Sequence, residues 1–379
     1  MFKVRTVAAA MLLATAAGIG AQPAPGPASP QMPADVAITA DVARRTATDL
    51  ADNLAEGYVF PDVAQRYAAM LRANAERGAY DGFTSGRALA ERLTADLREV
   101  SPDNHLRVGL RPAGAGPRPR GAAGEGPALR PQFPFAPIEE ARELAPGIAY
   151  IRFNLFPGDP ETVAAVERFV TEHADARAII IDARTHRGGG LAEMDVMFPY
   201  LFARPTTLVT MDTRASVDRA EGNPLGDSRL RLVPAGDDVV RREHYVEPHA
   251  SETRLHDAAV FVLTSAATGS AAEHLTLALK RTGRATIVGE TTAGAGHYGG
   301  MRPIGDHFAA FIPVGRTFDP DTGDDWEGDG VSPDIAVPAA AALTEALVRA
   351  GLDRAEAERI NGEVRPTQPM ERRRPRPAS

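Results

Sequence analysis

The sequence predicts an α/β core preceded by a small helical region. Between residues 148 and 289, short apolar runs alternate with helical patterns, which is typical of parallel strands joined by helical crossovers. Before them, residues 36–111 carry apolar side chains at helical spacing. Parallel sheets bind ligands at the carboxyl ends of their strands, so we expect functional residues just after the strands.

Composition narrows the possible chemistry. The formal net charge of -8 provides no basic surface of the kind that binds nucleic acid, so we expect no nucleic-acid partner. The chain has no cysteine, which excludes a cysteine nucleophile and thiolate metal ligands. Reactive groups must therefore carry oxygen or nitrogen.

The first 21 residues have the layout of a signal peptide. Lys3 and Arg5 precede an apolar run over residues 7–19, which ends at Gly20 and Ala21. That run is shorter than the roughly 20 residues that span a bilayer. We expect cleavage near Ala21, a flexible lead over residues 22–35, no membrane span in the mature chain, and a periplasmic or secreted location.

Three helices and one strand are expected in the helical N-terminal domain, residues 36–111. Apolar residues recur every four positions from Val42 to Leu54, and Pro61 prevents that helix from continuing. Two further apolar faces follow, and residues 106–110 alternate as a short strand does, with His105 just before them.

The rest of the chain divides by composition. Residues 112–137 are rich in proline, glycine and arginine and are interpreted as a linker, too short for a PDZ domain. The α/β core is assigned to residues 138–352. The Arg/Pro-rich residues 353–379 are expected to be a disordered tail.

Within the core, strands are expected at 148–153, 178–182, 208–211, 259–264 and 285–289, with helices from Pro160, after Gly190 and from Ser270. Residues 212–256 are polar and are interpreted as an irregular surface insertion. His244 and His249 are expected to face solvent there. The histidines lack His-Glu-x-x-His spacing, so no metal site and no cofactor are predicted.

A nucleophile is suggested where the strand at 259–264 leads into a helix. Small residues surround Ser270, and the free N–H groups and positive end of a helix can stabilise an oxyanion beside it. The spacing of Ser270 and Glu273 also fits a capping box, a purely structural role.

A second segment, 179–190, takes an apolar strand into a glycine turn. Gly188 and Gly189 allow backbone N–H groups to point inward, as an oxyanion hole requires. A phosphate-binding loop is disfavoured because no Gly-Lys-Ser/Thr sequence ends the turn. Asp182 is expected to pair with Arg184.

These segments, followed by Gly283–Gly294 and Asp319–Ile335 with its Trp326-Glu327-Gly328 sequence, resemble the tail-specific (C-terminal processing) protease family. The resemblance covers residues 36–337 and implies a crotonase-like (ClpP/crotonase-type) α/β core. It places the nucleophile at Ser270 and the oxyanion hole at Gly188, Gly189 and the N–H of Ala271. The family's usual asparagine in the first turn is His186 here.

The resemblance leaves two candidates for the general base. Many members carry a lysine in a Gly-Lys-Gly segment 25 positions after the serine, where this chain has Ala295. With the missing PDZ domain, this points to the branch that resembles the tricorn core and the interphotoreceptor retinoid-binding protein. That branch implies His105 as base and Glu327 as the group that orients it, with His297 as the alternative base. Asp103 either polarises a histidine or shapes its turn.

The resulting interpretation is a serine-type endopeptidase with Ser-His-Glu rather than Ser-Lys chemistry, acting on unfolded or tail segments of envelope proteins. Two alternatives stay open. The first is an inactive relative that binds an apolar small ligand or a peptide, and the second is an enzyme that hydrolyses a non-peptide ester or amide.

Overall fold

The computed structural model describes residues 34–111, 135–226 and 228–371. The predicted signal peptide, nearly all of the predicted lead and most of the predicted linker lie outside the described residues. In the described part, no helix combines the length and apolar character that crossing a membrane requires.

Three helices and a strand begin the described chain: α1 (Ala40–Gly57), α2 (Pro61–Glu76), α3 (Gly86–Val100) and β1 (Arg107–Leu110). The side chains of Thr39 and Ser85 cap α1 and α3 by accepting N–H groups of the first turn, and Pro61 starts α2 where no N–H partner is needed. The apolar faces of the three helices share one hydrophobic core with β1 and with a distant strand, β11 (Phe308–Phe318).

The core contains a six-stranded sheet in the order β12-β9-β8-β4-β3-β2. Its strands are β2 (Ile138–Ala145), β3 (Ile148–Phe153), β4 (Ala178–Asp182), β8 (Ala259–Thr264), β9 (Thr286–Gly289) and β12 (Ile335–Ala336). All neighbours are parallel except β2, which pairs antiparallel with β3. The predicted parallel sheet is therefore confirmed.

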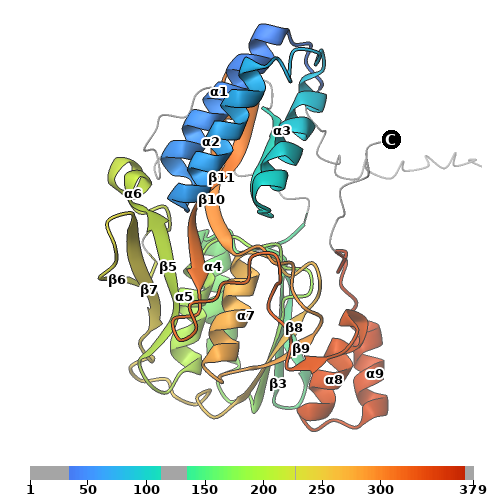
Figure 1. The fold of residues 1–379 in the computed structure, drawn as a ribbon. Helices are drawn as coiled ribbons and strands as arrows, with labels where there is room; N and C mark the ends of the chain where they lie inside the picture. The colour runs from blue at the N-terminus through green and yellow to red at the C-terminus, as the bar shows by residue number, and fades with distance from the viewer. Residues whose placement is uncertain (1–33, 112–134, 227, 372–379) are drawn as a thin grey trace, which may run out of the picture. The chain divides into compact units, whose positions relative to one another are not determined.

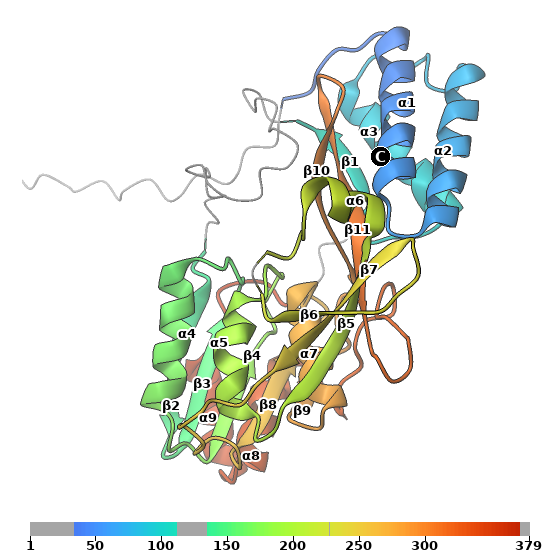
Figure 2. The same cartoon turned by 90° about the vertical axis from the view of Figure 1, so that its left-hand side faces the viewer.

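Alternation along β4 divides the sheet into two buried faces. Ile179 and Ile181 pack in one hydrophobic cluster with three helices, and Ile180 packs on the opposite face with two others. The first group is α4 (Pro160–Glu172), α5 (Ala192–Leu201) and α7 (Ala271–Arg281); the second is α8 (Ala342–Arg349) and α9 (Arg354–Glu363), preceded by the short 3-10 helix η1 (Ala339–Ala341). Figure 2 shows α4 and α5 along one side of this sheet.

A second sheet is antiparallel. It follows the order β1-β11-β5-β7-β6, with β10 paired to β11. Its remaining strands are β5 (Thr206–Arg214), β6 (Leu230–Val233), β7 (Val239–Val246) and β10 (His297–Ile304), and α6 (Ala215–Glu221) follows β5. One end of β11 pairs with β1 and the other with β5, so this strand links the helical region to the core (Figure 1).

Two predictions are wrong. Residues 212–256 are not an irregular insertion, because β5 continues to Arg214 and is followed by α6, β6 and β7. Residues 353–371 are not disordered, because α9 begins at its cap Asp353 and buries Ala357 and Ile360 against the core. The sequence interpretation predicted disorder from the proline and arginine content and did not take this short apolar stripe into account. Residues 372–379 lie outside the described part.

Candidate active site

Ser270 occupies the sharp turn between β8 and α7. It is the N-cap of α7, with φ 58° and ψ -120°, and among the described residues it is the only one other than glycine with a positive φ. Such a conformation costs a side-chain-bearing residue roughly 1–3 kcal/mol, so its surroundings must hold it in place. The turn from strand into helix that the sequence predicted at Ser270 is confirmed.

Glu273 stabilises this turn through hydrogen bonds to its carboxylate. Its buried carboxylate accepts hydrogen bonds of 2.6 to 2.9 Å from the N–H groups of Ser270, Gly294 and Ala295 and from the Thr292 hydroxyl. Burial raises the pKa of Glu273 even though these bonds oppose the shift. The Glu273 carboxylate makes its half of the predicted capping box with the Ser270 N–H, and the Glu273 N–H donates to the Ser270 carbonyl at 2.8 Å. The Ser270 hydroxyl makes no cap hydrogen bond, so the structural and catalytic interpretations of Ser270 are compatible.

The glycine turn after β4 lies directly against Ser270. Gly188 and Gly189 have φ values of 110° and 133°. A Cβ on Gly188 would lie 2.8 Å from the Ser270 Cβ, and one on Gly189 would lie 1.9 Å from the Phe156 carbonyl oxygen. Both positions therefore require glycine for conformation and for space.

The backbone donors of this turn differ in availability. The Gly188 N–H donates to Nδ1 of His186 at 3.1 Å, so it is already used. In the part of the chain that the structure describes, the N–H groups of Gly189 and Ala271 have no hydrogen-bond partner, and both residues line the cavity beside Ser270. The geometry thus favours Gly189 and Ala271 as the oxyanion donors, with Gly188 as the close-packed residue behind them.

His186 ties the glycine turn to the serine turn. Besides accepting the Gly188 N–H, it accepts the Gly269 N–H at its carbonyl oxygen at 3.1 Å. Complete burial lowers the pKa of His186 to about 3, so its ring stays neutral and can accept through Nδ1. The histidine that replaces the family's asparagine therefore serves as a backbone anchor.

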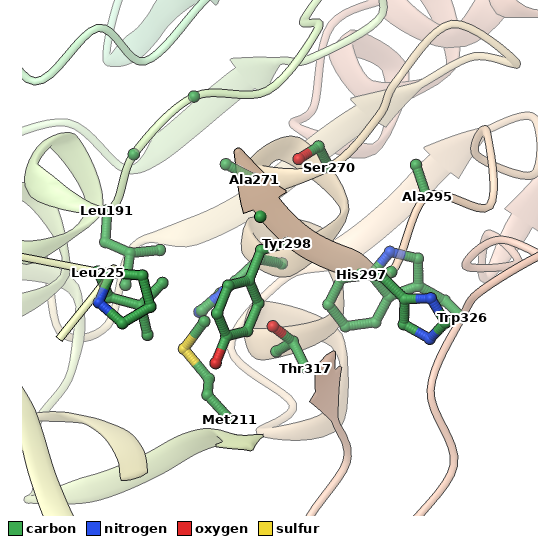
Figure 3. A pocket seen from close by; sticks show the side chains of 16 residues that line it. Leu191, Met211, Leu225, Ser270, Ala271, Ala295, His297, Tyr298, Thr317 and Trp326 are labelled. Atoms are coloured by element: carbon green, nitrogen blue, oxygen red, sulfur yellow. The ribbon is translucent and has the colours of Figure 1, made fainter. Parts of the chain in front are cut away.

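A cavity of about 190 Å³ opens in front of Ser270 (Figure 3). Its lining includes Gly189, Ser270, Ala271 and His297. The other lining side chains are mostly apolar: Leu191, Met211, Pro224, Leu225, Tyr298 and Trp326, with His274 and Thr317 among them. An engineered apolar cavity of about 150 Å³ holds benzene, so this one has room for a large side chain.

His297 brings an imidazole into the same cavity as Ser270. Its Nδ1 lies 2.7 Å from Oδ2 of Asp103, which also accepts the Tyr58 hydroxyl at 2.9 Å. In the described part of the chain, Nε2 has no hydrogen-bond partner, and its nearest carboxylate oxygen is Oδ2 of Asp325 at 3.8 Å. One nitrogen is thus held by a carboxylate, and the buried Nε2 makes no hydrogen bond within the described part, which is compatible with a general base.

The charges around His297 control its proton. Burial by itself would lower the pKa of His297, but the hydrogen bond to Asp103 and the nearby carboxylates of Asp325 and Glu327 raise it to about 9. For Asp103, burial opposes ionisation, but the hydrogen bond from His297 holds its pKa below the ordinary value. Burial raises the pKa of Glu327. At neutral pH the site is therefore an imidazolium–carboxylate pair.

Glu327 supports the backbone around this histidine. One of its oxygens accepts the Asn104 N–H at 2.6 Å, and the other accepts the N–H groups of Gly296 and His297 at 2.7 and 3.2 Å. The same oxygen lies 3.8 Å from Nδ1 of His297. The residue predicted to orient a histidine thus contacts His297 and the segment that carries Asp103.

His105 does not line the cavity beside Ser270. Its ring stacks on Phe311 of β11, with centroids 5.3 Å apart. Possible ligand atoms of Asp103, His105 and Glu327 lie within 4.8 Å of one another. The oxygens of Asp103 and Glu327 already accept several hydrogen bonds, which argues for structural bonding rather than a metal site.

A second histidine of the cavity has different neighbours. Nε2 of His274 lies 2.8 Å from Nδ1 of His244, whose Nε2 lies 2.9 Å from Oδ1 of Asp195. The expectation that His244 faces solvent is wrong, because β7 buries it at 1% exposure; His249 is half-buried and its ring stacks on Tyr200. The four-residue spacing from Ser270 to His274 was the available sequence signal, since it places both on one side of a helix.

Comparison with known proteins assigns the class. A strained serine at a strand-to-helix turn, two N–H groups without partners among the described residues and a carboxylate-bound histidine are groups that serine hydrolases use. The model of Peptidase family S41 matches residues 147–337, half of the chain, and that of the N-terminal domain of Peptidase_S41 in eukaryotic IRBP matches residues 39–143. The chain belongs to Peptidase family S41, which makes it a member of a serine peptidase family, as the sequence resemblance predicted.

Solved structures agree with the fold. A putative peptidase from Parabacteroides merdae is 17% identical, with 84% of this chain and 96% of that chain covered and a TM-score of 0.52. The photosystem II D1 C-terminal processing protease is 16% identical over 78% and 93%, with a TM-score of 0.49. Mature CPAF complexed with lactacystin is 17% identical over 57% and 52%, with a TM-score of 0.41, so this chain spans about half the length of CPAF. The predicted fold class is confirmed.

Proposed function

We propose that the protein hydrolyses peptide bonds through an acyl-enzyme on Ser270, with His297 as general base and Asp103 as the group that orients it. One observation carries the proposal: His297 shares the cavity of Ser270, its Nδ1 is bonded to Asp103, and its Nε2 makes no hydrogen bond among the described residues. The earlier candidate His105 stacks outside that cavity, and Glu327 supports the loop of His297.

The reaction follows from these positions. Ser270 Oγ attacks the carbonyl carbon while its proton passes to Nε2 of His297, and the resulting oxyanion accepts the N–H groups of Gly189 and Ala271. The C–N bond then breaks as His297 returns the proton to the leaving amine. A water molecule, deprotonated by His297, attacks the ester carbonyl and releases the carboxylic acid and the free serine.

An extended peptide suits the surroundings of the site. Strand β10 begins at His297, and among the described strands it pairs only with β11, so its other edge is open for an added strand. Tyr298 and Gly299 of this strand line the cavity. Main-chain hydrogen bonds along an open edge favour unfolded or tail segments of proteins over compact domains. With the expected export signal, such substrates would be envelope proteins.

The proposal is tested by labelling with a fluorophosphonate probe between pH 7 and pH 10. The purified natural protein is compared with Ser270→Ala, His297→Ala and His105→Ala. We expect labelling of the natural protein and of His105→Ala, and loss of labelling in the other two variants. Labelling that survives in His297→Ala but disappears in His105→Ala would return the base to His105.

Binding without catalysis is the second candidate, because the cavity wall is largely apolar and a protonated His297 cannot accept a proton. A folded natural protein that stays unlabelled across the whole pH range, while an apolar fluorescent ligand binds the cavity, would favour it. Labelling together with cleavage of an ester but of no peptide or unfolded protein would favour a non-peptide substrate instead.

A further inference from the structure

Three hydrogen-bonded residues at the cavity have no role in the proposed hydrolytic steps. Asp195, His244 and His274 form a chain of two hydrogen bonds that ends in the cavity wall. His244 and His274 are 1% and 2% exposed, so water cannot replace these bonds. Buried polar groups in an otherwise apolar wall have to be satisfied, and a fully satisfied chain fixes its rings in one orientation.

These two hydrogen bonds also determine which nitrogen of each histidine ring carries the proton. An ionised carboxylate only accepts, so His244 donates from Nε2 to Asp195 and, when neutral, accepts at Nδ1. His274 must then donate from Nε2 to His244, which leaves a lone pair on its Nδ1. Burial and the neighbouring His244 lower the pKa of His274 well below its ordinary value, so the ring stays neutral.

The position of His274 places this acceptor where a substrate side chain would lie. Its N–H donates to the Ser270 carbonyl at 3.0 Å, one helical turn from the nucleophile. The cavity reaches from the oxyanion donors Gly189 and Ala271 to His274. The side chain of the residue whose carbonyl is attacked therefore points into this space.

The Tyr298 hydroxyl, another polar group of the wall, is less suited to this role. The Tyr298 hydroxyl is held by the Thr213 hydroxyl at 2.7 Å and by the Asp212 carbonyl at 2.9 Å. No Asp or Glu lines the described cavity, so a cationic substrate side chain would lose its hydration without gaining a partner.

We propose that His274 determines specificity by accepting a hydrogen bond from the substrate side chain on the amino side of the cleaved bond. The preferred residue has an apolar body and an uncharged donor at its end, as tyrosine and glutamine do. This inference rests on the proposed peptidase function. It favours tyrosine over phenylalanine and glutamine over methionine, pairs that differ mainly in the donor.

The test uses two pairs of fluorogenic peptides that differ only at this residue, with kcat/KM measured for the natural protein. We expect a ratio of about 5-fold to 10-fold for tyrosine over phenylalanine and for glutamine over methionine. In His274→Leu, which lacks the acceptor, both ratios fall to about 1 or below. In His274→Asn, whose amide oxygen replaces Nδ1, the ratios stay above 1.

Ratios at or below 1 in the natural protein overturn the inference, and this measurement needs no variant to fold. Unchanged ratios in a folded His274→Leu overturn it too. The fluorophosphonate result separates the two proposals: labelling without the expected ratios leaves the peptidase function standing and refutes the role of His274. Absence of labelling and of peptide cleavage at every pH refutes both.

Discussion

Two histidines face one cavity, and their neighbours give them opposite tendencies. His297 contacts Asp103 directly at 2.7 Å, with Asp325 and Glu327 at 3.8 Å, and its pKa rises to about 9. His274 contacts a second imidazole, with Asp195 one ring farther away, and its pKa falls well below the ordinary value. Both rings are buried, so the identity of the directly bonded partner decides the sign of the shift.

This difference matches the proposed tasks. A general base exchanges a proton in each catalytic cycle, and carboxylates around it stabilise the imidazolium that forms. A residue that recognises a hydrogen-bond donor must keep its lone pair, and burial next to another imidazole prevents protonation. The following changes separate the two histidines, beginning with the largest expected effect.

Ser270→Ala removes the nucleophile on which both histidines depend. We expect peptide hydrolysis to fall about 10⁴-fold or more and probe labelling to vanish. Thermal unfolding serves as the control for folding. Residual hydrolysis close to the natural rate would show that another group is the nucleophile, and the comparison of the two histidines would then lose its basis.

His297→Ala removes the base and is expected to lower kcat by about 10²-fold to 10⁴-fold. His105→Ala is the matched control, since this histidine lies near the same carboxylates but stacks outside the cavity. We expect it to lower kcat less than about 10-fold. Equal losses in both variants would contradict the separation of catalytic and structural histidines.

The pH dependence of kcat/KM measures how far the neighbouring carboxylates raise the pKa of His297. Only its neutral ring accepts a proton, so kcat/KM is expected to rise with pH and to level off above about 9. Asp325→Asn removes one of the charges that raise this pKa, so the midpoint should move to lower pH. A natural protein with a midpoint near 6.5, the ordinary value for histidine, would show that the carboxylates do not act on the base.

The free energy of unfolding should decrease over the pH range in which kcat/KM is expected to rise. The pKa of His297 in the folded state lies above that of the unfolded chain, so the pair with Asp103 stabilises the fold fully below about pH 6.5. That contribution is lost as pH rises through about 9. Urea unfolding at pH 6 and pH 10, compared between the natural protein and His297→Ala, should show a larger difference at pH 6.

Asp195→Asn gives the smallest expected effect, because it changes the far end of the second histidine chain. An amide can donate as well as accept, so it no longer fixes the proton on Nε2 of His244. We expect the tyrosine-over-phenylalanine ratio to fall about 2-fold to 3-fold with little change in kcat for phenylalanine peptides. A large loss of kcat for both peptides would place Asp195 in the catalytic machinery instead.

Local patterns predicted most of the fold. Strands β3, β4 and β8 fall at the predicted positions because buried parallel strands are continuous apolar runs with clear ends. The hairpin of β10 and β11 was missed because Gly299, Gly300 and Pro303 interrupt the usual signals of a strand. Strand β11 also pairs with β1 and β5, which lie far from it along the chain.

The candidate site was predicted in part, for the same reason. Ser270 and the glycine turn can be recognised from short contiguous sequence segments. The hydrogen bond between His297 and Asp103 joins residues 194 positions apart, which no local pattern indicates. Without that contact, the sequence interpretation named His105 as the base and kept His297 only as the alternative. The chain from Asp195 through His244 to His274 also joins three separate segments, so composition alone placed His244 at the surface.

The long strand β11 determines how late during synthesis the proposed site can be assembled. Asp103 lies before β1, Ser270 follows β8, and His297 starts β10, and β11 pairs with β1, β5 and β10. Protein synthesis delivers the chain from its N-terminus, so earlier segments can fold before this strand exists. A growing chain that ends before Phe318 therefore carries Ser270 without the complete strand that joins the segments of Asp103 and His297.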